Sequence, residues 1–185
     1  MDVKELHRRT VEGWAERVRA VPDDAWHDPT PCPDWDVRAL VNHVTSENRW
    51  TVPLLRGATI DEVGDALDGD LLGDDPVRAS LDAAAAAAAD VEQLTTPDLV
   101  VHLSFGDTPA TEYVHQLAAD HLIHGWDLAT ATRGATDLDP ELVEEVARWF
   151  ADREELYRSA GAIGPRAPLT GDPQGDLLAV FGRTA

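Results

Sequence analysis

Four long segments of this chain place apolar side chains at helical spacing, and this pattern constrains the fold more than any other feature. The segments cover residues 2–20, 37–55, 75–93 and 108–134, and a fifth begins at Pro140. Apolar residues three and four positions apart line one face of an α-helix, which must be buried against another element. The sequence therefore predicts an all-α fold whose centre is a four-helix bundle.

The ends of these segments carry signals that start or stop helices. Asp2 and Asp75 are suited to cap a first turn, and Pro76 fits the first helical position after its cap. Pro22 ends the first segment. The stretch 28–34 contains three prolines and is expected to be a non-helical connection, because the residue before a proline avoids helical backbone angles.

The remaining segments have patterns of their own. Residues 95–107 are rich in β-branched side chains and too short for a helix, so they predict a short strand or one arm of a β-hairpin. Residues 57–74 are acidic and contain several glycines, which predicts a loop with a short turn. The helix that begins at Pro140 is expected to bury a stripe of apolar side chains: Val143, Val146, Trp149, Phe150 and Leu156.

A chain of 185 residues has the length of one domain. We expect the bundle to cover about residues 1–160 of a single domain over 1–185. The tail, residues 161–185, is rich in proline and glycine and is expected to contain a short extra helix at 176–181.

The chain is strongly acidic, with 35 Asp and Glu against 15 Lys and Arg and a formal net charge of −20. Nucleic acid and anionic membranes bind clustered Lys and Arg, so neither is an expected partner. A signal peptide, a membrane span and an intramolecular disulfide are not expected, the last because Cys32 is the single cysteine. A cytoplasmic protein is the expectation; a homodimer is compatible with the sequence, but no feature specifies one.

Asp120 and His124 are the strongest candidates in the chain for residues of a functional site. They lie four residues apart in a helical segment, so both side chains project from one face. A metal site in a bundle takes its ligands from facing helices, and His43 has the best position for a third ligand. Two imidazoles and one carboxylate leave a position open for water or substrate, which is typical of a catalytic metal site.

Several alternatives remain open at this site. His121 and His124 also share a helical face, so His121 could replace Asp120 as a ligand. Zinc is the expected ion, and nickel, iron or manganese also suit these donor atoms. Asp127 and Glu47, one turn beyond His124 and His43, are placed to orient the two rings. An Asp/His pair at this spacing is also common without a metal.

Cys32 lies between two prolines and has no basic neighbour in the sequence that would lower its pKa. We interpret it as a small buried side chain that anchors a loop, rather than as a nucleophile. No glycine-rich phosphate loop and no Gly-x-Ser-x-Gly motif is present, so ATP-dependent chemistry and serine hydrolysis are unsupported.

Three segments together resemble a known family. They are 30–43 (TPCPDWDVRALVNH), 120–129 (DHLIHGWDLA) and 176–183 (DLLAVFGR). The chain is similar to actinobacterial metal-binding proteins related to mycothiol-dependent maleylpyruvate isomerase, within the DinB-like superfamily. The resemblance implies a DinB-type four-helix bundle that holds a divalent metal, usually zinc. The isomerase uses two His and one Glu; His43, Asp120 and His124 match these positions, with Asp in place of Glu.

The resemblance implies an enzyme that uses a low-molecular-weight thiol, mycothiol, as a cosubstrate. The metal would favour the thiolate, which would attack a small electrophile in a transfer or isomerisation reaction. No residue can be assigned as the base that handles substrate protons. A zinc-dependent hydrolase and a non-enzymatic metal-binding regulatory or stress module are the alternatives.

Overall fold

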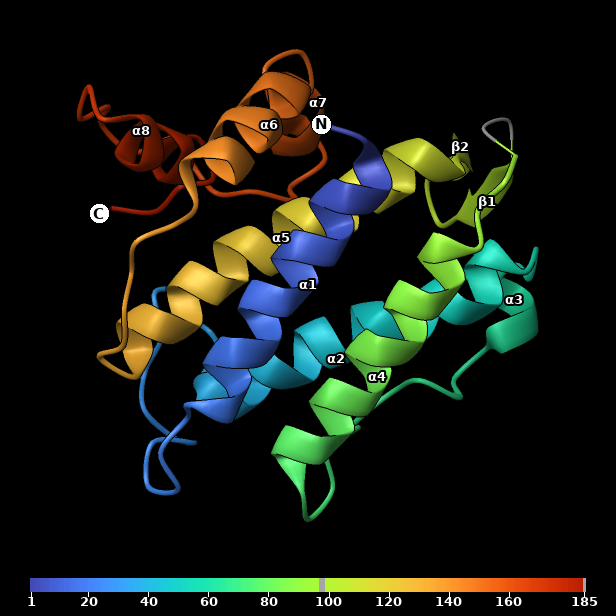
Figure 1. Cartoon of the computed structure of the whole chain (residues 1–185), viewed down its shortest axis with the longest axis horizontal. Helices are drawn as coiled ribbons and strands as arrows, with labels where there is room; N and C mark the ends of the chain where they lie inside the picture. The colour runs from blue at the N-terminus through green and yellow to red at the C-terminus, as the bar shows by residue number, and fades with distance from the viewer. Residues whose placement is uncertain (97–98, 185) are drawn as a thin grey trace.

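The computed structural model describes residues 1–96 and 99–184 (Figure 1). Four long helices form its centre: α1 (Val3–Arg19), α2 (Val37–Leu55), α4 (Pro76–Glu92) and α5 (Ala110–Ala131). Helix α1 packs along α5 and α2 packs along α4, while α1 also contacts α4 and α2 also contacts α5. The four helices therefore close around a shared interior, and the expected all-α fold with a helical bundle is confirmed.

Aspartates start three of these helices by accepting hydrogen bonds from backbone N–H groups of the first turn. Asp2 caps α1, Asp36 caps α2 and Asp75 caps α4. Asp36 Oδ1 accepts from the N–H of Ala39 at 2.8 Å. Each such cap satisfies a donor that the helix leaves free, so local sequence alone is enough to position the starts of these helices.

A small β-hairpin and a short helix fill the connections of the bundle. The strands are β1 (Val100–Leu103) and β2 (Gly106–Pro109), which pair antiparallel, and the short helix is α3 (Ile60–Val63). The predicted strand is confirmed for the described part of 95–107; residues 97–98 lie outside the described residues. The prediction that α5 starts at residue 108 is wrong, because Thr108 pairs with Val101 in the hairpin.

The C-terminal part of the chain packs against the middle of α5, where Ala118, Leu122 and Trp126 belong to the same buried cluster as side chains of the C-terminal helices. It contains α6 (Pro140–Phe150), α7 (Glu154–Ser159) and α8 (Pro173–Val180). Helix α8 packs on α6, and the rings of Phe150 and Phe181 stack with their centroids 4.3 Å apart. The predicted stripe is buried up to Phe150, but Leu156 is 67% exposed because the helix ends before it. No helix in the described part of the chain is both long and apolar enough to span a bilayer.

Two histidines are buried together between α1 and α5. The rings of His7 and His121 meet edge to face with their centroids 5.4 Å apart, and His121 Nε2 lies 3.1 Å from Asn48 Oδ1. Burial lowers the pKa of His7 to about 3 and that of His121 to about 4. Both rings are therefore neutral at neutral pH.

Replacing His7 by phenylalanine is expected to make the free energy of unfolding less dependent on pH between pH 7 and pH 5. In the unfolded chain His7 binds a proton below about pH 6.5, whereas the folded protein keeps it neutral down to about pH 3. The unfolded state then binds more protons as pH falls. This ring alone should lower the free energy of unfolding by about 2 kcal/mol between pH 7 and pH 5.

Urea unfolding at pH 7 and pH 5 measures this difference. His7→Phe should lose less stability than the parent between the two pH values, whereas His27→Gln, at an exposed position, should follow the parent. An unchanged loss in His7→Phe would show that His7 does not contribute to the acid sensitivity.

Candidate functional site

The structure brings His43, Asp120 and His124 together. His43 projects from α2, and the other two project from α5. His43 Nε2 lies 3.2 Å from Asp120 Oδ2, and His124 Nε2 lies 3.6 Å from Asp120 Oδ1. One ligand atom from each residue lies within 4.8 Å of the other two. The convergence follows from helical geometry, because positions 120 and 124 share the face of α5 that meets α2.

The donor set and its spacing fit a divalent ion. Zinc binds imidazole nitrogen and carboxylate oxygen at about 2.0–2.2 Å, so tetrahedral ligand atoms lie roughly 3.4 Å apart. The His43–Asp120 and His124–Asp120 separations, 3.2 Å and 3.6 Å, lie close to this value and end on the two different oxygens of the Asp120 carboxylate. About a third of the Asp120 side chain and of the His43 side chain is exposed, so the three residues form an open site rather than a closed structural one.

Charge at the site favours an ionised Asp120. Burial opposes ionisation, but the neighbouring His124 and the hydrogen bond with His43 outweigh it and hold the pKa of this carboxyl below its usual range. For His43, burial opposes protonation, but Asp120 raises the net pKa. Glu47 is on the same face of α2 as His43, where burial and the charge of Asp120 raise its pKa to about 7.

Asp127 fixes the orientation of His124. Its side chain is fully buried, and its Oδ2 lies 2.9 Å from His124 Nδ1. An ionised carboxylate can only accept, so His124 Nδ1 carries the hydrogen and Nε2 is left to face Asp120. The contact agrees with the prediction that Asp127, one turn beyond His124, orients its ring. Metal-binding imidazoles usually have such a partner on the second nitrogen.

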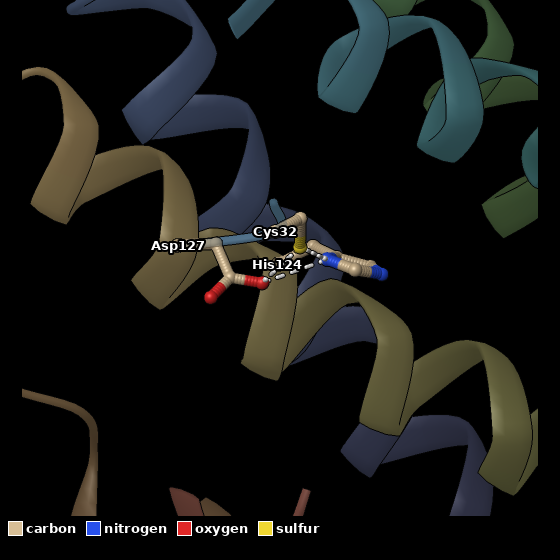
Figure 2. A group of neighbouring side chains, drawn as sticks. All are labelled: Cys32, His124 and Asp127. Carbon is tan, nitrogen blue, oxygen red and sulfur yellow. Dashed lines mark hydrogen bonds and ion pairs between the residues drawn. The ribbon is translucent and has the colours of Figure 1, made fainter. Parts of the chain in front are cut away.

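Cys32 joins this network from the loop before α2. Figure 2 shows its sulfur close to Asp127 and His124. Sγ lies 3.4 Å from Asp127 Oδ2 and 4.0 Å from His124 Nδ1. Burial and the charge of Asp127 raise the pKa of the thiol to about 12, so it stays protonated at neutral pH. The interpretation of Cys32 as an anchor agrees with this geometry better than a nucleophile does.

The group Cys32, His124 and Asp127 could also be considered as a metal site, since its ligand atoms lie within 4.8 Å of one another. Arg183, however, already binds two of its members. Its Nη2 donates to Asp127 Oδ2 at 2.7 Å and to Cys32 Sγ at 3.2 Å. A cation beside this guanidinium would be repelled, and His124 Nδ1 is already bonded, so the group is better explained as a hydrogen-bond network.

Sequence reasoning about the site missed Arg183 and Trp35. The Trp35 ring lies 4.7 Å from the His43 ring and 5.7 Å from the His124 ring, measured between centroids. Both residues lie within the segments that carry the family resemblance, which is the signal that could have identified them. His121, the alternative ligand, faces α1 and contacts Asn48 instead of joining His43.

These side chains border a cavity of about 720 Å³, here called the site cavity. Its volume is in the range of small-molecule binding sites. Aromatic side chains from several elements form much of its wall: Trp35, Tyr113, Trp149, Tyr157 and Phe181. An open site with two imidazoles and a carboxylate thus faces a space large enough for a substrate.

Comparisons with known proteins identify the family of this chain. The family model described as the mycothiol maleylpyruvate isomerase N-terminal domain matches residues 7–129. Two uncharacterized proteins of Mycobacterium tuberculosis, from strains CDC 1551 and H37Rv, are each 32% identical to the chain over 195 aligned residues. Each alignment covers 100% of this chain and 99% of the relative. No solved structure matches the chain significantly. The chain belongs to the mycothiol maleylpyruvate isomerase N-terminal domain family.

Proposed function

We propose that this chain is a metal-dependent enzyme that uses a low-molecular-weight thiol, mycothiol, to transfer a group to, or isomerise, a small electrophile. The observation that carries the proposal is the convergence of His43, Asp120 and His124 on the wall of the site cavity. The family supports the choice of thiol, because its description names mycothiol.

In this proposal His43, Asp120 and His124 hold a divalent ion, with zinc as the first choice and nickel, iron or manganese compatible with the same donors. A bound ion of this kind lowers the pKa of a coordinated thiol, so that the thiolate forms near neutral pH. Asp127 keeps the His124 ring in one tautomer and one orientation. The aromatic wall supplies flat surfaces against which the reactants pack.

Zinc-loaded protein is expected to accelerate the reaction of mycothiol with an electrophile such as monochlorobimane or a maleyl compound. The rate should depend on the thiol and should fall to the uncatalysed background in His43→Ala, which removes a ligand. His27→Gln, at an exposed position, is the matched control and should retain the parent rate. The rate is followed by fluorescence of the bimane adduct.

The outcome also separates the competing functions. Turnover of an ester or amide substrate without any thiol would contradict the proposal and indicate a zinc-dependent hydrolase. Zinc bound at one equivalent, with no turnover of either kind, would indicate a metal-binding module that is not an enzyme.

A further inference from the structure

Carboxylates outnumber cationic side chains around the site cavity. Asp34, Glu47 and Asp120 line it, and Asp127 lies directly behind His124. Among the described residues that line the cavity, Arg183 is the single Arg or Lys. Carboxylates of a substrate are bound most strongly by cationic side chains such as arginine, so the composition of this wall has consequences for the substrate.

The positive charge of Arg183 is already engaged by the protein. Its Nε and Nη2 donate to the two oxygens of Asp127 at 3.2 Å and 2.7 Å, a bidentate pair. Nη1 donates to the Phe181 carbonyl at 2.7 Å, and Nη2 also contacts Cys32. A carboxylate ligand would have to compete with a fully buried internal partner for this guanidinium.

A divalent ion at the site does not reverse the balance. The four carboxylates can carry four negative charges, while Arg183 and the ion together carry three positive charges, so the cavity has no excess of positive charge. The formal charge of −20 over the whole chain adds a negative field. A dianion is therefore opposed on approach by the net charge of the chain and meets no excess of positive charge inside the cavity.

The rest of the wall is suited to a flat, apolar molecule. The rings of Trp35, Trp149, Tyr157 and Phe181 come from four separate parts of the chain and face the same space, together with the apolar side chain of Ile123. Aromatic rings bind planar conjugated molecules by stacking and by edge-to-face contact. The volume of about 720 Å³ leaves room for such a molecule beside a thiol.

From the charge balance and the aromatic wall we infer that the electrophile is an uncharged, planar, conjugated compound of the enone or quinone class, and not a dicarboxylate. The inference rests on the proposed function, because it names the second substrate of that same cavity. In the reaction the thiol sulfur forms a bond to the β carbon, the π bond of the alkene breaks, and the proton of the thiol ends on the α carbon. No oxidant or reductant is needed.

Isothermal titration calorimetry of zinc-loaded protein with cinnamamide and cinnamate tests the inference, since the two share one planar skeleton and differ by one charge. The measurement is made at pH 8, where the carboxylate of cinnamate is ionised. Cinnamamide is expected to bind about tenfold more tightly. Glu47→Gln should reduce this preference several-fold, whereas Glu155→Gln, at an exposed position on α7, should not change it.

Equal or tighter binding of cinnamate would overturn the inference, and so would binding of neither compound. Because binding is measured without thiol, the result is independent of turnover. A preference for cinnamamide in a protein that shows no thiol-dependent reaction would support the selectivity of the cavity and contradict the proposed function. Tighter binding of cinnamate in a protein that does show thiol-dependent turnover would contradict the selectivity and support the proposed function.

Discussion

Asp127→Ala is expected to lower the free energy of unfolding by about 3–5 kcal/mol. Asp127 is fully buried and accepts hydrogen bonds from Arg183, His124 and Cys32. Its removal leaves the guanidinium of Arg183, of which 14% of the side chain is exposed, without its carboxylate. An unpaired buried charge costs more than the ion pair contributes, which is why the expected loss is large.

Urea unfolding of metal-free protein measures this effect without a contribution from metal binding. Asp127→Asn should lose less stability, because the amide oxygen can still accept one hydrogen bond. The double variant Asp127→Ala/Arg183→Leu should recover part of the loss, because it removes both charges. Asp82→Ala, which removes an exposed partner of Arg78, is the control and should change stability by less than about 0.5 kcal/mol. A similarly small effect of Asp127→Ala would show that Arg183 reaches water when its partner is absent.

The bundle could be predicted from the sequence because the signals that determine it are local. Caps such as Asp36 and Asp75 act within one turn, and the spacing of apolar residues defines the buried face of each helix. The end of α6 depends instead on distant contacts. Arg153 donates to the Trp149 carbonyl at the end of this helix and pairs with Glu112 on α5, and nothing in the adjacent sequence specifies that partner.

The same distinction applies to the site. Asp120 and His124 could be paired from the sequence because one helical turn fixes their relation, and Asp127 follows for the same reason. Arg183 could not be placed by such reasoning, because it contacts Cys32 across 151 positions of the chain. That contact exists because α8 packs on α6 and carries the chain end to the cavity. The tail therefore completes a site whose centre belongs to the bundle.

His43→Ala and His124→Ala are each expected to reduce bound zinc from about one equivalent to nearly none. Each variant removes one of three ligands, and the two ligands that remain hold zinc weakly. Asp127→Asn should retain zinc but weaken its affinity by roughly 10- to 100-fold, because it disturbs the orientation of His124 without removing a ligand. Elemental analysis after dialysis and competition with a zinc-binding dye measure stoichiometry and affinity.

His121→Gln separates the two ligand sets that the sequence leaves open. If Asp120 is the ligand, this variant should keep its zinc and Asp120→Ala should lose it. The opposite pattern would identify His121 as the ligand.

Thermal unfolding gives an independent measure of zinc binding. Zinc at 100 times its dissociation constant adds about 2.7 kcal/mol to the free energy of unfolding of a protein that binds it only when folded. Because His43 and Asp120 lie on different helices, the ion would link α2 to α5. A zinc-dependent increase in melting temperature that persists in both His43→Ala and His124→Ala would place the ion elsewhere in the protein.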